Sequence, residues 1–79
     1  NAVTNITYIL PEDSYIQLDI FSLKGELVYQ LENKFKLKGM YTLTWDGKNI
    51  LNQGVGSGVY LIKYTTSNEI LTEKLLLLK

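Results

Sequence analysis

The oxygen-bearing side chains of one loop are the first residues in this sequence whose types could do chemistry. Asp46, Asn49 and Asn52 follow one another at intervals of three residues, and Ca²⁺ accepts carboxylate and amide oxygens as ligands. No glutamate closes the set, and the spacing is not that of an EF-hand loop. The alternative is a turn in which Asp46 accepts hydrogen bonds from neighbouring backbone amides. The three residues are therefore weak metal candidates, and the turn is the favoured interpretation.

Glycines follow in the same loop, in the pattern Gly54-x-Gly56-x-Gly58. Such a pattern can bring backbone amides to a phosphate when a helix N-terminus follows it. Here the strand-forming pair Val59 and Tyr60 follows instead. Turns with positive φ explain the glycines better, and we expect no cofactor.

The composition disfavours catalysis. The 79 residues contain no histidine and no cysteine, which removes the commonest general base, the commonest metal ligand and any thiolate nucleophile. The adjacent acids Glu12 and Asp13 follow Pro11 in a turn, which cannot supply the buried environment that a general acid needs. Asn5-Ile6-Thr7 fits the glycosylation triplet, which we interpret as coincidence. The domain itself is predicted not to be an enzyme.

Aromatic residues raise a carbohydrate-binding alternative, because sugars stack on flat exposed rings. Five of the rings fall on faces predicted to be core: Tyr8, Tyr41, Trp45, Tyr60 and Tyr64. Tyr15, Phe21 and Phe35 remain as a platform for weak glycan binding. An apolar patch that meets a neighbouring domain explains the same residues equally well.

The charge balance and the apolar runs exclude other partners. Eight basic and eight acidic residues give a formal net charge of +0, so we expect no nucleic acid or anionic membrane partner. The most apolar run, Leu75 to Leu78, is far shorter than the roughly 20 residues of a membrane helix, so no membrane insertion is expected. The chain begins with Asn1 and shows no export segment, which favours a domain taken from a longer protein.

Polar and apolar residues alternate along most of the chain, which is typical of half-buried strands. Ile16, Leu18 and Ile20 are predicted to face the core. Trp45 ends another alternating run and is predicted to be a core residue at the mouth of the loop. The expected strands cover residues 5–10, 15–21, 26–31, 40–45, 59–65 and 70–78.

Two neighbouring stretches break this alternation. Leu27, Tyr29 and Leu31 share one face, yet the β-branched Val28 is the residue expected inside, which indicates a β-bulge. Residues 32–38 are highly charged and are predicted to form a loop with Phe35 tucked beneath it.

The last two predicted strands are apolar on both faces. Residues 59–65 are therefore predicted to form a central strand. Residues 70–78 begin half-polar and end apolar, which predicts a terminal strand buried on both sides and central in its sheet. Together, short strands, turn residues and no helical period predict an all-β immunoglobulin-like β-sandwich with Greek-key connections, formed as one domain by residues 1–79.

Several different short motifs follow one another along the chain in a characteristic order. They occupy residues 6–12, 16–25, 45–49, 54, 57–60 and 74–79. Together they resemble the flagellar hook-capping-protein-like immunoglobulin domain, which grades into the type A C-terminal sorting domain of the type IX secretion system in Bacteroidetes-type bacteria. The similarity runs over nearly all of the chain.

The resemblance implies a sandwich of about seven strands, attached behind a secreted or cell-surface bacterial enzyme or adhesin and ending at or near its C-terminus. The implied partner is the export machinery at the outer membrane. In sorting domains the region recognised during export contains the equivalents of Gly58, Tyr60, Lys74, Leu75, Leu76, Leu77, Leu78 and Lys79.

Two alternatives to sorting remain open at this point. One is a structural accessory domain that packs on a catalytic neighbour, such as a glycoside hydrolase or a protease. The other, less favoured, is a carbohydrate-binding module.

Overall fold

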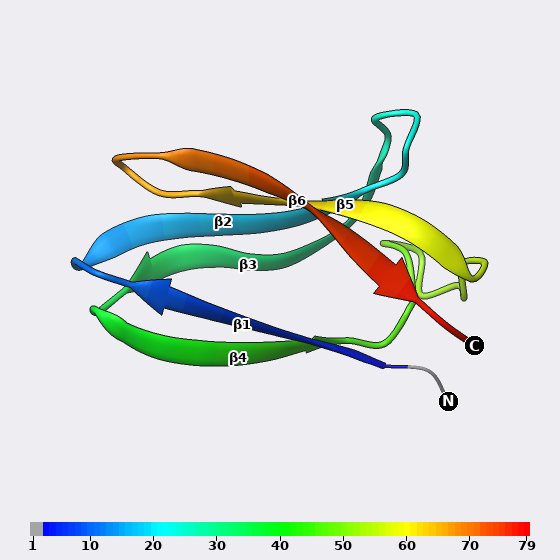
Figure 1. The fold of residues 1–79 in the computed structure, drawn as a ribbon, viewed down its shortest axis with the longest axis horizontal. Helices are drawn as coiled ribbons and strands as arrows, with labels where there is room; N and C mark the ends of the chain where they lie inside the picture. The colour runs from blue at the N-terminus through cyan, green and yellow to red at the C-terminus, as the bar shows by residue number, and fades with distance from the viewer. Residues whose placement is uncertain (1–2) are drawn as a thin grey trace.

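Two antiparallel sheets make up the molecule (Figure 1). The computed structural model describes residues 3–79, so the first two residues of the predicted domain lie outside the described part. In the smaller sheet, β1 (Thr4–Leu10) pairs with β4 (Gly39–Trp45). The larger sheet has the order β3-β2-β5-β6. Its strands are β2 (Ser14–Phe21), β3 (Leu27–Lys36), β5 (Gly58–Thr65) and β6 (Ile70–Leu77).

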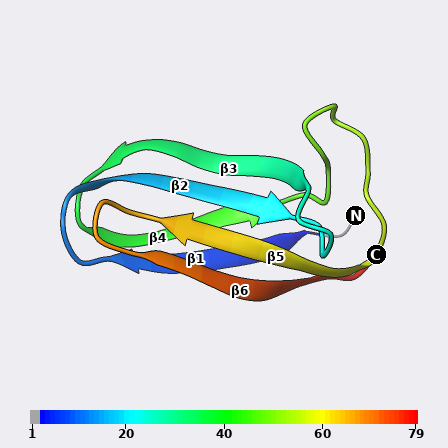
Figure 2. The ribbon, with the colours of Figure 1, turned by 90° about the horizontal axis from the view of Figure 1, so that it is seen from above.

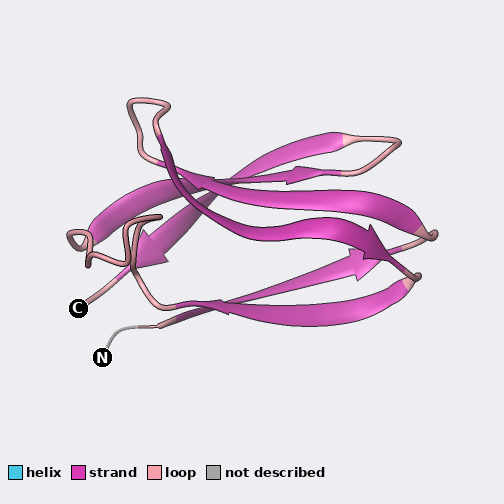
Figure 3. Cartoon of the chain, turned by 180° about the vertical axis from the view of Figure 1, so that it is seen from behind, coloured by secondary structure: helices cyan, strands magenta, loops and turns pink. Residues whose placement is uncertain are grey.

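The strands pair out of chain order. The chain changes sheet between β1 and β2, between β3 and β4, and between β4 and β5, so β1 pairs with β4 and β2 pairs with β5. Figure 2 looks down onto the larger sheet, with β3, β2, β5 and β6 side by side, and Figure 3 shows the two layers from behind. The prediction of an all-β sandwich is confirmed, with six strands in residues 3–79 where about seven were expected.

Alternation along the strands builds the core between the layers. Ile16, Leu18 and Ile20 are almost fully buried, as predicted. Trp45 and Leu77 are fully buried in one cluster with Ile20, whereas Ile16 and Leu18 belong to a second cluster. The sequence pattern therefore identifies the buried face correctly along β2.

β3 contains the predicted bulge. Its register with β2 shifts twice, once near Leu31 and once near Val28. Val28 is buried and Leu31 packs against the core, whereas Leu27 is exposed. A bulge inserts an extra residue and reverses the side-chain parity, which lets residues three apart face the same way.

The predicted loop at residues 32–38 is wrong. β3 continues to Lys36 and pairs with β2 along this stretch. Phe35 lies directly opposite Tyr15 and is 58% exposed, so it is not tucked beneath anything. β3 is an edge strand, and edge strands carry lysines that discourage pairing with other chains, which explains why a strand here has the charge pattern of a loop.

The predicted central position of the terminal strand is also wrong. β6 lies at the edge of the larger sheet, whereas β5 is internal as predicted. Leu75 and Leu77 face the core, but Leu76 and Leu78 are 54% and 69% exposed. Apolar residues on both faces usually indicate burial on both sides, and here the outer face of the strand is left open to solvent.

Candidate functional site

The region predicted to be recognised is a terminal segment, residues 74–79, carried largely by β6. Leu75 and Leu77 anchor it in the core, and the intervening side chains point outward because strand residues alternate in direction. Lys74 and Leu76 are exposed on the outer face, followed by the exposed Leu78. One backbone edge of β6 pairs with β5, and the other pairs with no strand in the described part of the chain.

A glycine loop, residues 46–57, packs against the terminal segment. A Cβ atom at Gly47 would lie 3.1 Å from a methyl carbon of Leu77, and a Cβ atom at Gly54 would lie 3.1 Å from Nζ of Lys79. The backbone N–H of Lys79 donates to Oγ of Ser57 over 3.0 Å. Missing side chains at these glycines therefore allow the close approach of the terminal segment.

Aromatic contacts brace this loop from inside. The indole N–H of Trp45 donates to the carbonyl of Lys48 over 2.9 Å. Tyr60 meets the Trp45 ring edge-on, at 5.2 Å between centroids, and its hydroxyl donates to the carbonyl of Gly56. Gly58 pairs with Leu77 at the start of β5. Of the predicted recognition residues, Tyr60 therefore contacts the glycine loop, and Gly58 pairs with the terminal segment itself.

The weak metal candidates occupy turn positions in this loop. Oδ1 of Asp46 accepts a hydrogen bond from the backbone amide two residues later, over 3.2 Å. Oδ1 of Asn49 accepts from the amides of Leu51 and Gln53, over 2.9 and 3.0 Å. Asn52 has a φ of 63°, which asparagine tolerates in turns. Within residues 3–79 no three His, Cys, Asp or Glu side chains are grouped as metal ligands.

Two members of the predicted aromatic platform come together. Tyr15 and Phe35 are cross-strand neighbours on the outer face of the larger sheet, and both are exposed. The hydroxyl of Tyr15 donates to Oδ1 of Asn33 over 2.6 Å. Phe21 lies at the far end of β2 and is half-buried, so the structure does not bring the three rings together.

The adjacent acids Glu12 and Asp13 each accept a hydrogen bond from another loop. Oδ1 of Asp13 accepts from the backbone amide of Lys38 over 2.8 Å, which ties two chain reversals together. Oε2 of Glu12 accepts from Nδ2 of Asn68 over 3.3 Å.

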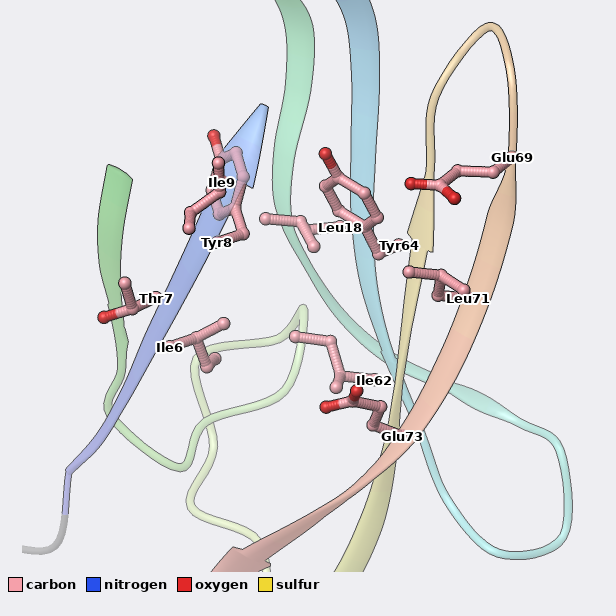
Figure 4. Close-up of a pocket in the computed structure, with 10 residues that line it drawn as sticks. All are labelled: Ile6, Thr7, Tyr8, Ile9, Leu18, Ile62, Tyr64, Glu69, Leu71 and Glu73. Atoms are coloured by element: carbon pink, nitrogen blue, oxygen red, sulfur yellow. The ribbon is translucent and has the colours of Figure 1, made fainter. Parts of the chain in front are cut away.

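The sequence analysis missed a groove between the edges of β1 and β6. The groove has a volume of about 230 Å³, and Figure 4 shows the side chains that line it. Burial raises the pKa of Tyr8 to about 12, and the charge of Glu32 adds to this effect. Burial also raises the pKa of Tyr64, with a contribution from Glu69. The available signal was Glu73, an acid on the same face of β6 as Leu71, Leu75 and Leu77, together with Glu69 just before the strand.

Comparisons with known proteins were made for the whole chain. Residues 1–78 match the model of a family described as a secretion system C-terminal sorting domain. A crystal structure of FlgD from P. aeruginosa has a TM-score of 0.74 with this chain, at 22% sequence identity. The match covers 95% of this chain and 58% of that one, so this chain spans less than two thirds of the FlgD structure. This likeness shows the fold. A search of curated proteins found no match.

Proposed function

The chain belongs to the family of secretion-system C-terminal sorting domains, and we propose that the export machinery recognises it through the terminal segment on β6. The chain is a type IX secretion sorting signal, and it belongs to a bacterial protein that is secreted or displayed on the cell surface. Such a domain interacts with the secretion machinery. The part of the chain that the structure describes contains no helix long and apolar enough to cross a membrane.

The position of β6 at the edge of its sheet supports this proposal. An edge strand offers unpaired backbone N–H and C=O groups to a partner, and the side chains on its outer face supply specificity. In this segment Leu76 and Leu78 are exposed apolar side chains with Lys74 preceding them. The partner surface should therefore be apolar, with a carboxylate near the lysine.

The other predicted recognition residues are assigned a supporting role. Leu75 and Leu77 hold β6 against the core. Tyr60 braces the glycine loop on which Lys79 rests, and Gly58 begins the strand that pairs with β6. Substituting these residues should affect export by displacing the segment, whereas Leu76 and Leu78 should contact the machinery directly.

We also infer that the chain is one non-catalytic domain of a longer secreted protein. Glu12 and Asp13, its only adjacent acids, each accept a hydrogen bond that ties loops together. These contacts fit a structural role for both carboxylates.

Packing on a neighbouring domain is a second candidate function. The outer face of the larger sheet carries an apolar patch in which Phe21 lies opposite Leu61 and Val59 lies opposite Leu76. Exposed apolar patches often mark interaction surfaces. The Tyr15 and Phe35 pair supports weak glycan binding less well, because the Tyr15 hydroxyl is already bonded to Asn33.

A reporter fusion separates these functions. Residues 1–79 are fused behind a periplasmic reporter in a bacterium with a type IX system, and reporter activity is measured in medium and periplasm. We expect export of the parent fusion and at least a tenfold loss for the double variant Leu76→Ser, Leu78→Ser. The matched control is Ile9→Ser, Met40→Ser, because these two apolar residues are at least as exposed and lie on the smaller sheet.

The control should be exported normally, and thermal melting should show both double variants folded. A parent fusion that stays in the periplasm would favour the accessory role. Equal export of the two double variants would remove Leu76 and Leu78 from the recognition surface.

A further inference from the structure

The smaller sheet has fewer strands than the larger sheet, so it leaves part of the larger sheet uncovered beside β1. This uncovered space is the gap described below. Two strands face four, and one edge of β1 pairs with no strand among residues 3–79. The inner face of β6 is consequently covered over only part of its length. Leu75 and Leu77 are buried, whereas Leu71, on the same face nearer the start of the strand, is 47% exposed.

The gap is wedge-shaped. At one end Oγ1 of Thr4 donates to the carbonyl of Leu76 over 3.2 Å, so β1 and β6 touch. Towards the other end of β1 the groove of about 230 Å³ opens between Tyr8 on β1 and Tyr64 and Leu71 on the larger sheet (Figure 4). A ligand would therefore enter from the open end.

Two buried tyrosine hydroxyls beside the groove lack hydrogen-bond partners among the described residues. The side chain of Tyr8 is only 9% exposed, and its hydroxyl and that of Tyr64 have no hydrogen-bond partner among the described residues. Their rings are 5.5 Å apart, and Figure 4 shows both hydroxyls at the same end of the groove. A buried polar group without a partner costs free energy, so a ligand that bonds to these hydroxyls would be stabilised.

The rim of the groove is acidic. Glu73 lines it from β6 and Glu69 lines it from the turn before β6, on either side of Leu71, and no basic residue lines it. Carboxylates at this position complement a ligand that carries a positive charge. Apolar walls, two hydroxyls and an acidic rim together define the chemistry of the occupant.

We propose that this groove binds an extended strand of a partner polypeptide, which adds to the free edge of β1 as a third strand of the smaller sheet. The free edge of β1 presents backbone N–H and C=O groups at every second residue. Facing sheets pack about 10 Å apart, so inward side chains of the added strand would reach Leu71 and Tyr64. One inward lysine or arginine would pair with Glu73.

This site is independent of the proposed export surface. It uses the backbone edge of β1 and the inward side chains of β6, whereas the export proposal uses the backbone edge of β6 and its outward side chains Leu76 and Leu78. Inward glutamates also discourage sheet edges from aggregating, and that simpler role is one outcome of the test below.

The test uses a capped synthetic peptide that alternates valine and threonine, with one lysine among the valine positions. It is titrated into the ¹⁵N-labelled chain while amide chemical shifts are recorded by NMR. We expect saturable shifts along β1 and at Tyr64, Leu71 and Glu73. N-methylation of the peptide at alternate residues along one edge should weaken binding at least tenfold, because it removes hydrogen bonds to β1. N-methylation along the opposite edge should change binding less than twofold.

Protein variants provide the second arm. Glu73→Lys should weaken binding about tenfold, and Tyr64→Phe, which keeps the ring, should weaken it a few-fold. Glu26→Lys makes the same charge change in the exposed hairpin before β3 and should have no effect. The proposal would be overturned by an absence of saturable shifts, by shifts confined to other strands, or by equal effects of the two N-methylated peptides. The glutamates would then serve only to discourage aggregation at the sheet edge.

Discussion

At the level of single residues, Trp45 connects the core to the glycine loop. Its ring is fully buried, and its N–H holds the carbonyl of Lys48. We expect Trp45→Ala to lower the free energy of unfolding by about 3–5 kcal/mol, as for other large core truncations. Urea denaturation measures this loss, with the exposed Met40→Ala as control, expected within about 0.5 kcal/mol of the parent. A loss under about 1 kcal/mol for Trp45→Ala would contradict the core role.

Tyr8 should make stability fall at alkaline pH. Burial raises its pKa from 10.0 to about 12 in the folded state, so between these values the folded state binds more protons than the unfolded state. The contribution of Tyr8 to stability is therefore fully present below pH 10 and is lost as pH rises towards about 12. Tyr8→Phe should flatten this part of the pH profile in urea denaturation. Met40→Ala, which removes an exposed side chain without a titratable group, should keep the profile of the parent.

At the level of secondary-structure elements, the bulged strand β3 makes a prediction that simple alternation would reverse. Alternation groups Leu27 with Tyr29 on one face, but the structure buries Val28 and exposes Leu27. We expect Val28→Ala to cost about 1.5 kcal/mol and Leu27→Ala less than about 0.5 kcal/mol. Chemical denaturation of the two variants decides this, and a larger cost for Leu27→Ala would argue against the bulge.

The outer face of β6 is uncovered, which changes how its exposed leucines are interpreted. A further layer over this face of the larger sheet would bury Leu76, and its apolar character would then need no further explanation. No further layer of residues 3–79 covers this face, so the exposed Leu76 and Leu78 form an apolar surface, and such surfaces often mark interaction sites. The tertiary position of the strand thus turns a stability feature into a candidate recognition feature.

At the level of the whole molecule, the terminal segment both completes the core and carries the proposed signal. Two truncations should separate these roles. Removal of residues 78–79 leaves Leu75 and Leu77 in place, so the chain should keep a cooperative thermal transition by circular dichroism while the reporter fusion loses export. Removal of residues 75–79 deletes two buried leucines and should abolish the transition. Normal export after the shorter truncation would show that residues 78–79 are not needed for recognition.

The sequence by itself determined the local features of this protein. Period-two alternation identified Ile16, Leu18 and Ile20 as core, the Val28 anomaly indicated the bulge, and Trp45 marked the buried end of its strand. Turn residues and the absence of helical periodicity gave the all-β class, and the ordered motifs pointed to the family. These features depend on neighbours in the chain, which is why local patterns reveal them.

Only the tertiary structure decided which strand edges and faces remain open. An exposed apolar residue at an interaction surface gives the same local sequence pattern as one that faces the core. The sequence alone therefore predicts that Leu76 lies in a strand buried on both sides. The edge strand around Phe35 has the local charge pattern of a loop, because an edge strand carries lysines that discourage pairing with other chains. The groove at Tyr8 and Tyr64 exists because two strands cover four. How much of one sheet the other covers depends on strands far apart in the chain, so it cannot be predicted from a local sequence pattern.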